Sequence, residues 1–151
     1  MNDSKSGVRK AATNTLAKYD DPKVIDIAKQ FLEYDDWRIR RSVVDLLIKI
    51  GTDASLEPLI SCLNDEDSYV KSWAAKGLGK LKSIKDIDPL LRMLKDEDPK
   101  LRLSAAKALG EIGDKKALEP LIASMGEDNW EVRKEIENAL NSIDSKWADS
   151  L

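Results

Sequence analysis

The sequence predicts an all-α solenoid built from about five repeats of 31 residues, with roughly nine helices. The first observation is a set of apolar columns that recur every 31 residues, of which the clearest are Val8, Ile39, Val70, Leu101 and Val132, and Leu16, Leu47, Leu78, Leu109 and Leu140. The second is the spacing of apolar residues inside each repeat, which is that of an amphipathic helix and nowhere that of a strand. Because a helix pair of this size cannot bury its apolar face alone, the repeats must stack.

Each repeat contains a shorter first helix and a longer second helix. The second helix is expected to begin at a cap whose side-chain oxygen accepts from unpaired N–H groups of the first turn. Such caps recur one period apart at Asp36, Asp67, Asp98 and Asn129. Gly51 and Gly113 follow the last apolar residue of two second helices, where a helix C-terminus favours glycine.

The first helix is also marked by cap residues in register, which are Asp21, Thr52, Ser83 and Asp114. Proline follows six residues after the last three caps, and we expect it to kink the helix or delay its start. Small residues indicate where helices approach each other closely, and they are Ala74, Ala75, Gly79, Ala105, Ala106 and Gly110.

We expect residues 1–151 to form a single domain, with repeats at about 5–34, 35–64, 65–95, 96–126 and 127–151. The last repeat is expected to cap the C-terminal end of the array. Glu137 and Asn141 stand there at positions where inner repeats have alanine and glycine, and terminal repeats need a polar outer face. Trp147 is expected to fold back over this end.

Composition excludes several classes of function. The chain has no histidine and one cysteine, Cys62, which removes His-based catalysis and Cys/His zinc sites. We therefore predict no enzyme activity, no cofactor and no metal. No apolar stretch is long enough for a membrane span and the polar N-terminus lacks a signal-peptide core, so we expect a cytoplasmic protein without a membrane partner. Cys62 shares its column with Phe31, Met93 and Ser124 and is expected to be a core thiol.

Residues 96–114, DEDPKLRLSAAKALGEIGD, and residues 117–122, ALEPLI, resemble the HEAT-like repeat family. The resemblance is closest to its short-repeat branch, first associated with phycobilin lyases, and it covers almost the whole chain. It implies a right-handed α-solenoid whose second helices line a concave face. It says less about function, because the family includes scaffolds, chromophore lyases, a hydroxylase and DNA-repair proteins.

Helical geometry selects the side chains that this face would expose, which lie within about 60° of Lys76 and its equivalents. Ten of these positions are basic and four acidic, whereas the whole chain carries a charge of −3. Seven of the basic residues lie in the first three repeats, with Asp45 as their only acidic companion. We predict a partner-binding surface around Trp73 that consists of Lys10, Lys18, Arg38, Arg41, Ser42, Asp45, Lys49, Tyr69, Ser72, Trp73, Lys76, Lys80 and Lys107.

Other conspicuous residues are assigned structural roles. The basic column of Arg9, Arg40, Lys71, Arg102 and Arg133 lies off the exposed arc and is expected to pair with acids between repeats. Trp37 and Trp130 occupy first turns and are expected to cover helix ends. The acidic runs at residues 65–67 and 96–98 are expected to cap helices and to favour their dipoles. The lysines of the exposed arc also fit a simpler role, the solvation of helical faces.

We predict a non-catalytic scaffold that binds an acidic or amphipathic segment of another protein on this face. A second hypothesis is nucleic-acid binding of the HEAT-like DNA-repair type, because basic residues alternate with Tyr69 and Trp73. A sequence pI near 5.1 argues against it, and Asp45 is the only acid of the basic face that could serve a glycosylase. A third is a bilin-lyase-like subunit. The iron site of the hydroxylase relatives needs histidine, which this chain lacks.

Overall fold

The computed structural model describes residues 4–19, 21–82 and 86–150. Within these ranges it contains nine α-helices and no strand, as the sequence predicts. The chain divides into two compact halves, residues 1–74 and residues 75–151. The helix α5 (Ser68–Leu81) begins in the first half and ends in the second.

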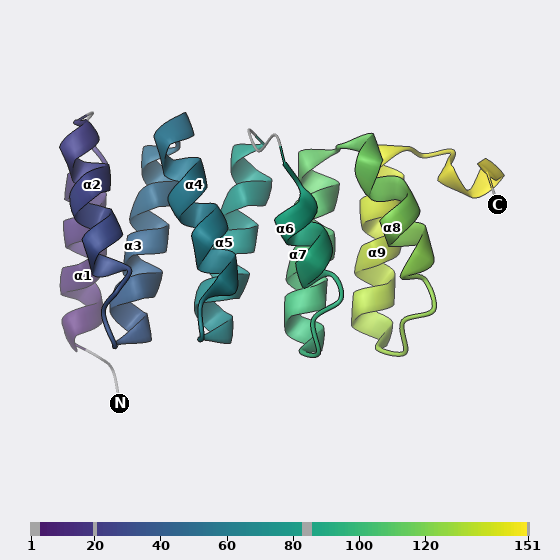
Figure 1. Cartoon of the computed structure of the whole chain (residues 1–151), viewed down its shortest axis with the longest axis horizontal. Coiled ribbons are helices and arrows are strands. Elements are labelled where there is room, and N and C mark those ends of the chain that lie inside the picture. The colour runs from purple at the N-terminus through teal and green to yellow at the C-terminus, as the bar shows by residue number, and fades with distance from the viewer. Residues whose placement is uncertain (1–3, 20, 83–85, 151) are drawn as a thin grey trace. The chain divides into compact units, whose positions relative to one another are not determined.

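The N-terminal half contains two complete second helices, α1 (Ser4–Leu16) and α3 (Trp37–Ile50), which pack against each other. Its first helices are α2 (Pro22–Phe31) and α4 (Asp53–Ser61), the latter extended by a short 3₁₀ turn over Cys62–Asn64. The helices α2 and α4 lie together on one side of α1 and α3 (Figure 1).

The C-terminal half repeats this layered arrangement. The second helices α7 (Pro99–Ile112) and α9 (Trp130–Ile143) pack against each other. The first helices α6 (Asp88–Met93) and α8 (Leu118–Ala123) each cover the second helix that follows (Figure 1). Two 3₁₀ turns, Lys115–Ala117 and Trp147–Ser150, precede α8 and follow α9.

The predicted caps of the second helices are confirmed. The side-chain oxygens of Asp36, Asp67, Asp98 and Asn129 each accept from a backbone N–H two residues on, at 2.9 to 3.0 Å. Gly51 and Gly113 end α3 and α7 in the left-handed conformation, with φ of 64° and 77°. The equivalent residue after α5 is Lys82, which adopts φ of 54° despite its side chain.

The first helices agree with the sequence prediction only in part. The helices α6 and α8 start at Asp88 and Leu118, just before their prolines, so the expected delay is confirmed there. In α4 the delay is absent, because the helix begins at Asp53 and continues through Pro58. Proline at this sixth helical position removes only one backbone hydrogen bond. The predicted cap Ser83 lies outside the described residues.

Arginine clamps tie successive repeats together, as the basic column predicts. The five N–H groups of Arg40 reach the carboxylates of Asp65 and Glu66 and the carbonyl oxygens of Tyr34 and Asp35, at 2.6 to 3.0 Å. Two repeats later, Arg102 holds both carboxylate oxygens of Glu127 at 2.7 Å. This fork-on-fork geometry is the strong form of a charge-assisted hydrogen bond.

The acidic runs also act as predicted. Asp65, Asp96 and Glu127 each accept from the backbone N–H two residues ahead, at 2.8 to 3.0 Å, and so shape the turn before a second helix. In the described ranges, no group of three carboxylate or cysteine side chains is arranged to hold a metal ion. The acids of these turns serve the arginines and the backbone.

Close helix packing is confirmed at both predicted glycines. A Cβ placed on Gly110 would come within 2.8 Å of the Cα atom of Ala139, and one on Gly79 within 2.9 Å of the Cα atom of Ala108. Beyond α9, the indole Nε1 of Trp147 donates to the side-chain oxygen of Asn141 at 3.0 Å, so Trp147 does fold back as expected. That the array ends at this point stays a prediction.

The single cysteine is a core thiol. Cys62 is buried, and the loss of solvation raises the pKa of its thiol to about 12. Burial and the raised pKa both disfavour the thiolate, which is the nucleophilic form, as expected of a core thiol. As regards membranes, none of the described helices combines the length and the apolar character that a bilayer crossing requires.

Candidate functional site

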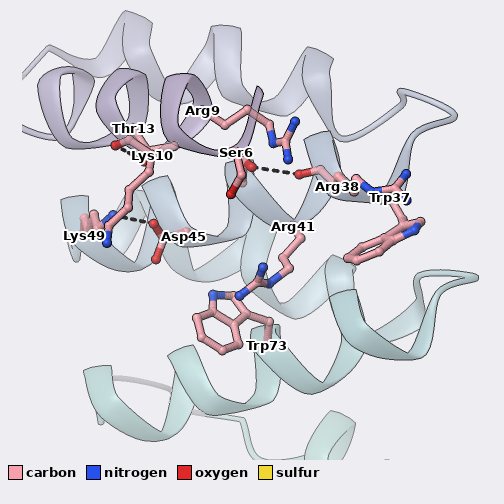
Figure 2. A pocket seen from close by; sticks show the side chains of 11 residues that line it. Ser6, Arg9, Lys10, Thr13, Trp37, Arg38, Arg41, Asp45, Lys49 and Trp73 are labelled. Carbon is pink, nitrogen blue, oxygen red and sulfur yellow. Dashed lines mark hydrogen bonds and ion pairs between the residues drawn. The ribbon is translucent and has the colours of Figure 1, made fainter. Parts of the chain in front are cut away.

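A polar pocket of about 700 Å³ opens in the N-terminal half, where α1, α3 and the first turns of α5 meet. All three elements are second helices, so the pocket lies on the side of the fold where the sequence predicts a binding surface. Its lining consists of Ser6, Arg9, Lys10, Thr13, Trp37, Arg38, Arg41, Ser42, Asp45, Lys49 and Trp73 (Figure 2).

The pocket is strongly basic. Five of its lining side chains are cationic and only one, Asp45, is acidic. Asp45 is already engaged by Lys49, one helical turn away, in an ion pair drawn in Figure 2. Arg9, Lys10, Arg38 and Arg41 add four further positive charges to the lining, and this excess of positive charge attracts anions into the pocket.

The centre of the pocket is a guanidinium that lies on an indole ring. The Cζ atom of Arg41 is 4.4 Å from the centroid of Trp73, within the range of a cation–π interaction (Figure 2). Within the part of the chain that the structure describes, the Arg41 guanidinium makes no hydrogen bond and no ion pair. Its position is thus fixed by stacking, while its N–H groups stay available to a ligand.

A second arginine–tryptophan pair lies at the edge of the pocket. The Cζ atom of Arg38 lies 5.1 Å from the centroid of the Trp37 ring. Trp37 also stacks on Tyr69, with ring centroids 5.4 Å apart and an interplanar angle of 22°. The expected role of Trp37, to cover a helix end, is therefore incomplete, because the residue also lines the pocket. Arg38 in addition pairs with Asp36 at 3.5 Å.

The pocket brings together seven of the thirteen residues predicted from the sequence, namely Lys10, Arg38, Arg41, Ser42, Asp45, Lys49 and Trp73. Tyr69 adjoins it through Trp37. Lys18 and Ser72 lie in the same half but do not line the pocket. Lys76, Lys80 and Lys107 belong to the C-terminal half, and their part in a binding surface stays a prediction.

Sequence reasoning missed four lining residues, Ser6, Arg9, Thr13 and Trp37. Arg9 was assigned to the structural column that clamps successive repeats. The carboxylates that clamp Arg40 come from Asp65 and Glu66, whose equivalents one repeat earlier are Tyr34 and Asp35, so only one carboxylate is in register with Arg9. Arg9 also lines the pocket, where Figure 2 labels it, and its expected pairing between repeats stays a prediction.

The family of the chain follows from its repeats. The family model for HEAT repeats matches residues 1–79, 35–97 and 56–141, which together cover most of the chain. The chain belongs to the HEAT repeat family. No curated protein matches it in sequence.

Solved structures share the fold at low sequence identity. The complex of CpcE and CpcF of phycocyanin lyase from Nostoc sp. matches with a TM-score of 0.72 and 22% identity, over 99% of this chain and 65% of that chain. Human deoxyhypusine hydroxylase in complex with glycerol matches with a TM-score of 0.73 and 23% identity, over 85% of this chain and 46% of its own. This chain thus corresponds to less than half of the hydroxylase.

Designed repeat proteins also match, at a somewhat lower TM-score. A designed armadillo repeat protein in complex with a (KR)4 peptide has a TM-score of 0.64 and 19% identity, over 87% of this chain and 69% of its own. At these identities the likeness shows a solenoid repeat fold and nothing of the chemistry.

Proposed function

We propose that this protein is a non-catalytic interaction module whose N-terminal half binds an acidic segment of another protein in the basic pocket. The observation that carries the proposal is the Arg41–Trp73 stack, at 4.4 Å, in a pocket whose only acid is already paired with Lys49. A stacked guanidinium with open N–H groups is preorganised to receive a carboxylate through two parallel hydrogen bonds.

The surroundings of Arg41 favour an extended, multiply charged ligand. Lys10 and Arg38 stand on α1 and α3 around it, so that several carboxylates along one segment can each meet a cation. The indole of Trp73 adds an apolar surface, and tryptophan and arginine are the residues on which binding energy concentrates. The fold supports a scaffold role, since designed repeat proteins of similar structure hold peptides.

The test is fluorescence anisotropy with a labelled 12-residue peptide of aspartate, glutamate and glycine, compared with a peptide that has asparagine and glutamine instead. We expect the acidic peptide to bind and Arg41→Gln to weaken binding about tenfold, as the loss of one charge-assisted pair predicts. Lys134→Gln is the matched control, since Lys134 is an exposed cation of a second helix outside the pocket. This variant should bind as the wild type does.

Single-stranded DNA of 12 nucleotides is measured in parallel, because cations beside exposed aromatic rings also suit nucleic acids. If the oligonucleotide binds more tightly than the acidic peptide, and Arg41→Gln and Trp73→Ala both weaken that binding, the module is a nucleic-acid binder. Equal affinity for the acidic and the amide peptide would reject the pocket as an acid-binding site.

A further inference from the structure

A second, apolar groove of about 330 Å³ adjoins the basic pocket, with which it shares Arg9, Thr13 and Ser42, and is bounded by α1, α2 and α3. Its walls include Leu16, Val24, Ile27, Phe31 and Leu46. Ile27 and Phe31 are 54% and 39% exposed, although both are large apolar side chains. Contiguous exposed apolar surface of this kind marks an interaction site.

The other repeats show what covers the equivalent surface. Leu16 is 42% exposed, whereas its equivalents Leu109 and Leu140 are at most 1% exposed. Those two leucines lie on α7 and α9, which are covered by the first helices α6 and α8. On α1 the corresponding surface is not covered in this way, which leaves Leu16 open to a ligand. What fits this surface is therefore a helix of the first-helix kind.

Charge narrows the choice of occupant. The helices α1 and α2 carry five basic residues, Lys5, Arg9, Lys10, Lys23 and Lys29, against the single acid Asp26. Arg9 itself lines the groove. A second copy of this chain would present the same cations, and the approach of two such faces is opposed by repulsion between like charges.

Two of the four described first helices, α4 and α8, show the complementary chemistry, whereas α2 and α6 also contain basic residues. The helix α4 contains Asp53 and Glu57 and no basic residue, and α8 contains Glu119 and no basic residue. Both bury leucine on the side that faces a second helix, at Leu59 and Leu121. We infer that the groove docks an acidic amphipathic helix of a partner protein, with its apolar stripe against Leu16, Ile27 and Phe31. This inference rests on the apolar walls of the groove and not on the Arg41–Trp73 stack of the pocket.

The test uses the full chain and a labelled 14-residue helical peptide with leucine at intervals of three and four residues and glutamate on the opposite face. A second peptide replaces each glutamate by lysine. We expect the acidic peptide to bind and Ile27→Glu or Leu16→Glu to weaken it roughly tenfold or more, since each variant places a charge where an apolar side chain is buried on binding. Circular dichroism checks that both variants keep their helices.

Two control variants separate this groove from other surfaces. Trp130→Glu changes a 63% exposed apolar residue of the C-terminal half, and Arg41→Gln removes the centre of the basic pocket. Trp130→Glu should bind the amphipathic peptide as the wild type does, and the binding that Arg41→Gln retains should still be lost on Ile27→Glu. A loss of binding with Arg41→Gln alone would place the peptide in the pocket and overturn the inference for the groove.

Two further results would also overturn it. Equal binding of the lysine peptide would show that charge plays no part in the choice of occupant. Sedimentation equilibrium that finds a wild-type dimer, made monomeric by Ile27→Glu, would show that a second copy covers the groove.

Discussion

The helices α1 and α7 carry the same apolar columns but have very different surroundings. Val8 and Leu16 on α1 are largely exposed, whereas their equivalents Leu101 and Leu109 on α7 are buried. A Cβ on Gly7 of α1 would meet no atom within 4 Å, whereas one on Gly110 of α7 would collide with Ala139. The repeat sequence therefore gives each second helix an apolar face, and this face is buried only where neighbouring helices pack against it.

The largest effect is expected when a leucine of the same repeat column is shortened to alanine, once on α7 and once on α1. Leu109→Ala should lower the free energy of unfolding by about 3 kcal/mol, because it leaves a cavity in packed surroundings. Leu16→Ala, the same change in the same column, should cost less than about 1 kcal/mol. Urea denaturation followed by circular dichroism measures both. Equal losses would mean that α1 is covered as α7 is.

Glycine-to-alanine substitutions test the same difference between α1 and α7 by adding a methyl group instead of removing side-chain atoms. Gly110→Ala should destabilise the protein by about 2 kcal/mol, because the Cα atom of Ala139 leaves no room at 2.8 Å. Gly7→Ala should instead stabilise α1 by about 0.5–1 kcal/mol through its higher helix propensity. Thermal unfolding monitored at 222 nm distinguishes the two signs, and a gain at Gly110 would contradict the packing described.

The turns differ as well, since Glu127 clamps Arg102 where the first such turn has Tyr34. The hydrogen bonds from Arg102 hold the pKa of Glu127 below its ordinary value. A depressed carboxylate pKa contributes stability that is complete above the unfolded value of about 4.3 and disappears as the pH falls through the folded pKa. Glu127→Gln should therefore cost about 1.5 kcal/mol at pH 7.

The pH profile checks that prediction. The melting temperatures of the wild type and Glu127→Gln should differ at pH 7 and converge on acidification below about pH 4. Tyr34→Phe is the matched control, because its turn holds no carboxylate at that position. A constant difference between wild type and Glu127→Gln from pH 7 to pH 3 would show that the charge of Glu127 is not what matters.

The smallest effect concerns the ends of α3, α5 and α7. Gly51 and Gly113 adopt the left-handed conformation that Lys82 must also adopt after α5. Lys82→Gly should stabilise the protein by about 1 kcal/mol, because glycine reaches positive φ without a steric penalty. Gly113→Ala should have the opposite sign. Equilibrium unfolding of the two variants is sufficient to compare them.

Much of the fold is predictable because periodic residues have local causes. Caps such as Asp36 and Asn129 act within two residues, and the columns of Val8 and Leu16 repeat five times. The start of α4 was not predictable from Pro58, since whether one lost backbone bond delays a helix depends on its tertiary packing.

The candidate site was predictable where it follows one helix face. Lys10, Arg41 and Asp45 share the arc around Lys76, and the structure places them in one pocket. Arg9 and Trp37 lie off that arc and enter because long side chains reach across from α1 and α3. The stack of Arg41 on Trp73 joins different helices, and a single helical wheel contains no information on such a pair.

The Arg40 clamp has a consequence for how this sequence can change in length. One guanidinium holds the carbonyl groups of Tyr34 and Asp35 together with the side chains of Asp65 and Glu66. Inserting or deleting a single residue between Arg40 and Asp65 would turn α4 or its loops by about 100° and remove the carboxylate from reach. We therefore expect substitutions to be tolerated more readily than insertions or deletions, in keeping with the 31-residue spacing of the repeats.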